Sequence, residues 1–208
     1  GLRPIGMVGS GPNSTGITEY EIASGNTNVI FNSGIVVPLA TGFVDQAGDT
    51  AGGTTQALGV LTGVMYQDSV RKQPVWLDYW PGSGAVSVDT NHPVRAYVAD
   101  NPNQLFQISS DASLTNKATA QAAVFANTDL GTSARTGSTD NGKSNSQASV
   151  ANIATTATLP LRIVGIVDDD ANSDFTVAGI PLKVRLNAHF NAGTRRFDSQ
   201  TTADSTGL

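Results

Sequence analysis

The sequence of 208 residues contains no cysteine. This absence excludes a disulfide framework, a thiolate metal site and a cysteine nucleophile. Charged residues make up only 14% of the chain and aromatic residues only 6%. No apolar run reaches the length of a membrane-spanning helix, which needs about 20 such residues. We therefore expect no membrane partner.

The few charges are mostly negative. The net charge is −5 and the isoelectric point is about 4.8. Binding to nucleic acid requires clustered lysine and arginine, so we expect no nucleic-acid partner. The first residues lack the apolar segment of a signal peptide, and we expect synthesis in the cytoplasm without export.

Small and polar residues replace the missing charged and aromatic ones, and they separate many short apolar runs. This pattern predicts an all-β fold, a single antiparallel β-barrel or β-sandwich domain with at most one short helix. The only plausible helix covers residues 113–128. Predicted strands cover residues 17–22, 26–31, 34–38, 39–44, 58–66, 73–80, 85–89, 94–100, 105–109, 158–167, 175–178 and 180–190.

The chain divides into a body and loose ends. Residues 17–190 form the predicted β-rich body, and within it residues 128–152 are a long Gly/Ser/Thr-rich loop or a projecting finger. Residues 191–208 are a polar C-terminal tail. Residues 1–16 are an extended N-terminal arm, either disordered or docked on a neighbouring molecule. Four apolar residues favour docking and are predicted interface residues: Leu2, Ile5, Met7 and Val8.

The densest apolar and aromatic stretch is residues 58–82, which reads as a β-hairpin with a polar turn. On its return strand, alternation places Trp76 and Trp80 on one face, beside Asp78. Exposed tryptophan pairs are costly. This face therefore meets another layer or another chain, and Trp76 and Trp80 are predicted interface residues. A sugar-binding platform is the alternative interpretation.

No group of residues indicates catalysis. His92 lies in a turn, and neither it nor His189 is accompanied by a triad or a metal pair. His189 falls on the polar face of the last strand, facing solvent or a subunit interface, and is a predicted interface residue. The glycine-rich stretches lack the lysine and the strand–helix context of a phosphate loop. We expect no enzyme activity and no cofactor.

One acidic turn weakly resembles a calcium loop. Ser173 stands where the loop needs glycine, and Gly179 stands where it needs a bidentate glutamate. A solvated turn is therefore the favoured interpretation, with no metal. If calcium bound, the ligands would be Asp168, Asp170, Asn172 and Asp174.

Several stretches within residues 58–190 resemble virion proteins of tailed bacteriophages. They are GVLTGVMYQDSVRKQPVWLDYWPG, VRAYVADNPNQLFQIS, LPLRIVG and LKVRLNAHF, in this order. Asn101 departs from the family pattern, in which a second aspartate is more usual, and this departure affects only a turn. The resemblance is to capsid decoration, or cement, proteins.

The resemblance implies a structural role without catalytic residues. Such proteins lie on the outer capsid surface of the virion, typically as trimers, and clamp the major capsid protein. The expected partners are therefore the major capsid protein and other copies of this chain, in a homotrimer. The alternative function is a carbohydrate-binding β module of a virion appendage that contacts host surface glycans.

Overall fold

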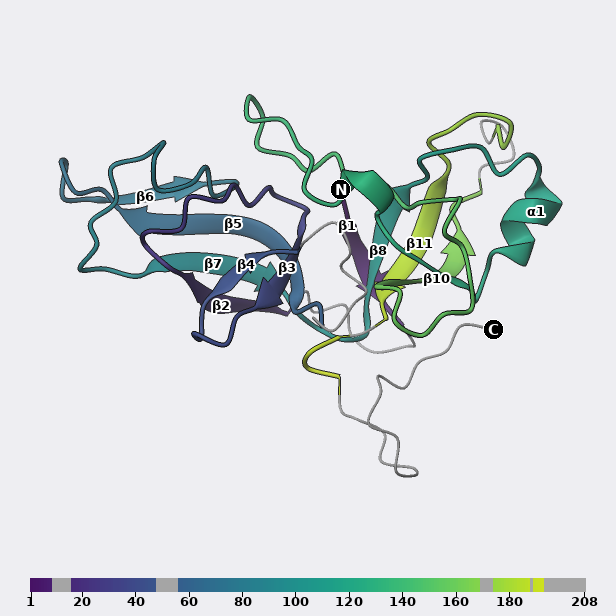
Figure 1. The fold of residues 1–208 in the computed structure, drawn as a ribbon, viewed down its shortest axis with the longest axis horizontal. Coiled ribbons are helices and arrows are strands. Elements are labelled where there is room, and N and C mark those ends of the chain that lie inside the picture. The colour runs from purple at the N-terminus through teal and green to yellow at the C-terminus, as the bar shows by residue number, and fades with distance from the viewer. Residues whose placement is uncertain (9–15, 48–55, 169–173, 188, 193–208) are drawn as a thin grey trace.

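The computed structural model describes residues 1–8, 16–47, 56–168, 174–187 and 189–192. The described secondary structure is nearly all β: two antiparallel sheets and one short helix (Figure 1). The described strands do not close into a barrel, and their arrangement is consistent with a β-sandwich domain. The prediction of an all-β fold with at most one short helix is confirmed, and the barrel alternative is excluded.

The first sheet, called sheet A, contains both the first and the last of the described strands in chain order. Its middle strand shows the predicted alternation: Leu182 and Val184 are buried, and Lys183 between them is not. The strand order is β1 (Arg3–Met7), β8 (Gln104–Ser109), β11 (Pro181–Leu186), β10 (Leu161–Ile166) and β9 (Asn127–Thr128).

The second sheet, called sheet B, is built around its longest strand, β5. One edge of β5 (Gly59–Gln67) pairs with β7 (Val94–Ala99). The other edge pairs with β3 (Ile35–Pro38) at the start of β5 and with β6 (Pro74–Leu77) at its end. Gly59 in β5 is needed for close packing, because a side chain there would collide with the backbone of Ala99. The strand order is β2 (Ile17–Ile22), β7 (Val94–Ala99), β5 (Gly59–Gln67), β3 (Ile35–Pro38) and β4 (Val44–Gln46), with β6 (Pro74–Leu77) paired to β5.

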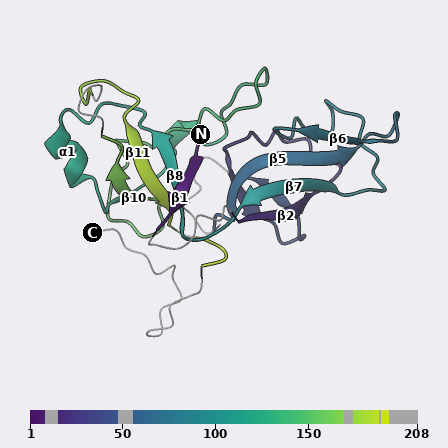
Figure 2. The same cartoon turned by 180° about the vertical axis from the view of Figure 1, so that it is seen from behind.

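Two apolar clusters form the core. The larger cluster joins the sheets, because Val60 and Ala99 of sheet B pack with Phe106 and Val184 of sheet A. The smaller cluster lies under the inner face of sheet B and contains the fully buried Trp80. Figures 1 and 2 show the two sheets side by side along the long axis of the molecule.

The polar segment 128–152 connects the two sheets. Within it, the backbone of Gly142 accepts a hydrogen bond of 2.9 Å from the N–H of Asn32. The Tyr79 hydroxyl donates to the Thr139 carbonyl at 2.9 Å, and the Tyr79 ring stacks on Phe31. The segment includes a short 3-10 helix, η1 (Gly131–Ser133). It is therefore a finger that packs on sheet B and ties it to sheet A.

Four predicted strands are wrong. In the predicted strand 39–44 only Val44 belongs to a strand, because residues 39–43 form the turn between β3 and β4, where the N–H of Leu39 donates to the Phe43 carbonyl at 2.8 Å. Residues 26–31 and 85–89 make only isolated bridges, from Ile30 to Trp80 and from Val88 to Asp68. Residues 175–178 form turns, because the Asp174 side chain accepts the backbone N–H of Thr176 and curls the chain. The predicted helix is shorter than its pattern: α1 spans Lys117–Ala122, and Asn116 caps its N-terminus.

The prediction of an N-terminal arm is also wrong for the first described residues. Arg3–Met7 form β1 and pair with β8 of the same chain. Leu2 is fully buried in the larger core cluster, so its predicted contact with a neighbouring molecule is incorrect. Residues 9–15 of the proposed arm lie outside the described ranges. The tail prediction likewise concerns residues 193–208, which are not described.

Candidate interaction surface

The outward face of sheet B carries an aromatic pair. Trp76 on β6 is 63% exposed, and it stacks on Tyr97 of β7 with ring centroids 5.2 Å apart and planes inclined by 22°. Strand β5 lies between β6 and β7, and Gly63 is the β5 residue opposite Tyr97. Because Gly63 has no side chain, the two rings can meet above β5.

Two charged side chains flank this pair. The Tyr97 hydroxyl lies 3.4 Å from Glu19 Oε2 as a hydrogen-bond donor. Glu19 Oε1 is 3.5 Å from an Arg95 guanidinium nitrogen, and both side chains are about half exposed. Burial, and then the charge of Glu19, raise the pKa of Tyr97 above its ordinary value. A surface ion pair adds little stability. The main effect of the Glu19 contacts is therefore to hold the Tyr97 ring in position.

A shallow groove of about 100 Å³ lies beside the aromatic pair. One of its lining residues, Met65, lies opposite Trp76 in the sheet. Its wall combines apolar groups with an imidazole and a guanidinium. The lining residues are Met65, Tyr66, Gln67, Pro74, His92, Pro93 and Arg95.

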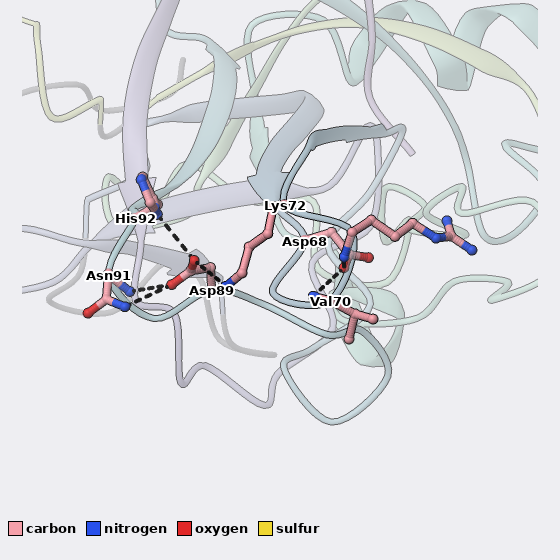
Figure 3. Close-up of polar contacts among 7 residues, drawn as sticks. Asp68, Val70, Lys72, Asp89, Asn91 and His92 are labelled. Carbon is pink, nitrogen blue, oxygen red and sulfur yellow. Dashed lines mark hydrogen bonds and ion pairs between the residues drawn. The ribbon is translucent and has the colours of Figure 1, made fainter.

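His92, one of the residues that line the groove, belongs to a polar turn organised by Asp89 (Figure 3). Asp89 accepts hydrogen bonds from the backbone and side chain of Asn91 at 3.1 and 3.0 Å. It also lies 3.4 Å from Lys72 Nζ and 3.6 Å from His92 Nδ1. The backbone N–H of Asn91, followed by the side chains of Lys72 and Asn91, lowers the pKa of Asp89. Asp89 therefore holds His92 at the edge of the groove.

Asp68 shapes the neighbouring turn (Figure 3). It accepts the backbone N–H groups of Val70 and Arg71, each at 2.8 Å. The N–H of Arg71, followed by that of Val70, lowers the pKa of Asp68. Asp68 Oδ1 and Asp89 Oδ1 thus each accept two hydrogen bonds from residues of their own turns. Both carboxylates therefore stabilise turns.

Trp80 does not share the exposed face with Trp76. Strand β6 ends at Leu77, so the strict alternation stops before Trp80. The Trp80 indole is fully buried. Its Nε1 donates to the Asn26 carbonyl at 3.1 Å, and its ring meets Tyr66 edge-on at 6.2 Å. The predicted interface role of Trp80 is therefore wrong, while that of Trp76 stays a prediction.

The other predicted interface residues lie elsewhere. Ile5 and Val8 are 37% and 44% exposed at β1, the edge strand of sheet A, and Met7 is half-buried. They belong to a different sheet from Trp76. The structure therefore does not gather the predicted interface residues into one patch.

His189 is buried within its own chain, contrary to the prediction of a solvent or interface position. It is 3% exposed. Strand β11 ends at Leu186, so the alternation does not extend to His189, which forms an isolated bridge with Ala57. Nδ1 accepts the backbone N–H of Asn191 at 3.0 Å. Burial lowers the pKa of His189, and the charge of Asp100 opposes this shift.

The acidic turn gives no metal centre in the described ranges. Asp168 forms an ion pair with Lys117. Asp174 accepts hydrogen bonds from the backbone and hydroxyl of Thr176 at 2.9 and 2.6 Å. The other two proposed ligands, Asp170 and Asn172, lie outside the described residues. Among the residues that are described, no group of three histidine, aspartate or glutamate side chains could hold a metal ion.

The sequence interpretation missed Tyr97 and Arg95 as members of the outward face. Alternation along residues 94–100 already placed both on one side of that strand. The missing information was the strand order, because only the pairing of β5 with both β6 and β7 brings Tyr97 to Trp76.

Comparisons with protein-family models, with curated proteins and with solved structures found no match to this chain. No helix within the described ranges is long and apolar enough to cross a membrane.

Proposed function

We propose that this chain is a bacteriophage capsid decoration protein, which binds the outer surface of the head and stabilises the major capsid shell. The observation that carries the proposal is the exposed Trp76, fixed against Tyr97 on the outward face of sheet B. Tryptophan and tyrosine are enriched among the residues that dominate protein–protein binding energy. The same residues lie in the stretches that resemble phage head proteins.

The rigidity of this surface supports a binding role. Trp76 lies on β6 and Tyr97 on β7, the two strands that flank β5. The opposite face of these strands packs in the smaller core cluster. Side chains that are already ordered lose little conformational entropy on binding. A small rigid patch repeated many times over a shell also gains avidity. A modest contact area per subunit is therefore enough.

Self-association is part of the same proposal. The family resemblance implies a homotrimer, and the apolar side chains of Ile5 and Val8 at the edge of sheet A are available for subunit contacts. The acidic balance of the chain disfavours contact with packaged nucleic acid.

Quantitative mass spectrometry of purified phage heads tests this function. We expect the chain to be present at a copy number comparable to that of the major capsid protein. Heads that contain the shell protein but lack this chain would contradict the proposal. Analytical ultracentrifugation of the purified chain tests the trimer separately.

One observation favours a second candidate, a carbohydrate-binding module of a virion appendage. The indole of Trp76 is 63% exposed and lies beside the groove that contains His92 and Arg95. An exposed aromatic face next to polar side chains suits a sugar ring. A glycan array distinguishes the candidates: hits that disappear in Trp76→Ala favour the module, and an array without hits removes it.

A further inference from the structure

The outward face of sheet A carries a line of basic side chains, which we call the basic stripe. Its members are Arg3, Arg162, Lys183 and Arg185. Arg3 and Lys183 are both opposite Gln107, and Arg185 is opposite Arg162. The stripe thus crosses the adjacent strands β1, β8, β11 and β10, which lie side by side in Figures 1 and 2.

Strand alternation fixes the direction of these side chains. Leu182, Val184 and Leu186 of β11 are buried in the larger core cluster. Lys183 and Arg185, which alternate with them, must therefore face outward. The same reasoning applies to Arg162, whose neighbours Leu161 and Ile163 are buried. Four of the 12 lysine and arginine residues consequently share one face in a chain of net charge −5.

Three of the four side chains of the stripe are not paired with a carboxylate in the described part of the chain. Arg3, Lys183 and Arg185 form no ion pair within the described part of the chain, and Arg185 Nε is buried without a hydrogen-bond partner there. Arg162 Nε donates to Asn127 Oδ1 at 3.2 Å. Burial, and then the charge of Arg185, lower the pKa of Arg162.

Like charges directly opposite each other destabilise a sheet, as with Arg162 and Arg185. A bound anion would compensate the positive charges of Arg3, Lys183 and Arg185. Guanidinium groups bind carboxylates with two parallel hydrogen bonds. The arrangement is therefore suited to a ligand that carries several carboxylates.

We propose that the basic stripe binds an extended acidic segment of a partner protein, with aspartate or glutamate at alternate positions. Four strands at spacings of about 4.8 Å give the stripe a length of about 14 Å. Alternate residues of an extended peptide are about 7 Å apart, so three carboxylates cover this length. The site is on a different sheet from Trp76 and does not depend on the function proposed above.

An acidic protein segment suits the stripe better than nucleic acid does. Single-stranded nucleic acid is held by aromatic side chains interleaved with basic ones. None of the residues that form the stripe or lie opposite its members in the sheet is aromatic: they are Gln107, Asn127, Gly165 and the four basic residues. The net charge of −5 also repels a long polyanion.

Fluorescence polarisation with the full chain tests the proposal. The probe is a labelled peptide of alternating glutamate and threonine, and a labelled oligothymidylate is the competing probe. We expect the peptide to bind at low salt, to weaken as salt rises, and to bind the double variant Lys183→Ala/Arg185→Ala at least about tenfold more weakly. The control Arg71→Ala/Lys143→Ala removes the same charge from sheet B and the finger, and we expect it to bind as the wild type does.

Three results would overturn the proposal. They are no binding of the peptide to the wild type, an equal loss in both double variants, and tighter binding of the oligothymidylate than of the peptide. If removal of Arg185 prevents folding, the charge reversal Arg3→Glu replaces that variant, because Arg3 is exposed. Unchanged peptide binding by Arg3→Glu would then count against the stripe.

Discussion

The indole of Trp76 stacks on the ring of Tyr97 across strand β5, with centroids 5.2 Å apart. Trp80, four residues further along the chain, is fully buried. One tryptophan thus belongs to the surface and the other to the core. This division distinguishes an effect on binding from an effect on folding.

The first prediction concerns the two tryptophans. Trp80→Ala should reduce the free energy of unfolding by about 3–5 kcal/mol, as removal of a buried aromatic does. Trp76→Ala should reduce it by no more than about 1.5 kcal/mol, the value of one aromatic pair. Urea unfolding followed by fluorescence of the remaining tryptophan measures both. Similar losses in the two variants would show that Trp76 is also a core residue.

The alternation of apolar residues predicted much of the framework. It located the strand that contains Leu182 and Val184, and it located the hairpin on which Trp76 lies. The alternation gave the wrong face for Trp80, because bends at Asp78 and Tyr79 end the strand before that residue. Local bends of this kind depend on contacts that are distant in sequence.

The candidate surface was only partly predictable for the same reason. Trp76 stands out by its residue type, but Tyr97 joins it only through the strand order of sheet B. The packing of the finger could not be predicted either, since its polar sequence contains no pattern of apolar residues. Its position depends on Tyr79 and Phe31, which are far from it in sequence.

The second prediction concerns Gly142 in the finger. Its φ is +68°, and a side chain there would collide with the Tyr79 ring. Gly142→Ala should therefore reduce the free energy of unfolding by about 1–3 kcal/mol. The control is Gly84→Ala, because a side chain at Gly84 would meet open space. Thermal unfolding compares them, and equal stability of both variants would contradict the packing of the finger on Tyr79.

The third prediction concerns Leu2, which is fully buried although it lies near the beginning of the chain. Leu2→Ala should cost about 2–5 kcal/mol of unfolding free energy. Ile5→Ala in the following strand, β1, should cost much less, because Ile5 is 37% exposed. Denaturant unfolding measures the difference. A negligible effect of Leu2→Ala would restore the interpretation of this segment as a loose arm.

The fourth prediction is a pH dependence caused by His189. Burial holds its folded-state pKa below the ordinary value of 6.5, so the unfolded chain binds the proton more readily. The stabilising contribution is therefore fully present above pH 6.5 and decreases as the pH falls below 6.5 toward the folded-state pKa. Asp100, which faces the imidazole, reduces the size of this shift.

Urea midpoints of the wild type and of His189→Gln, measured across this pH range, test that dependence. The wild type should lose more stability than the variant on acidification. Parallel pH profiles would show that His189 does not contribute.

Reconstitution on isolated phage heads that lack this chain tests the proposed decoration function most directly. Purified wild-type protein should co-sediment with the heads to saturation, at a copy number comparable to that of the major capsid protein. Trp76→Ala should bind at least about tenfold more weakly. Val177→Ala, which removes an exposed apolar side chain away from sheet B, should bind as the wild type does. Wild-type protein that stays in the supernatant at all concentrations would contradict the proposed function.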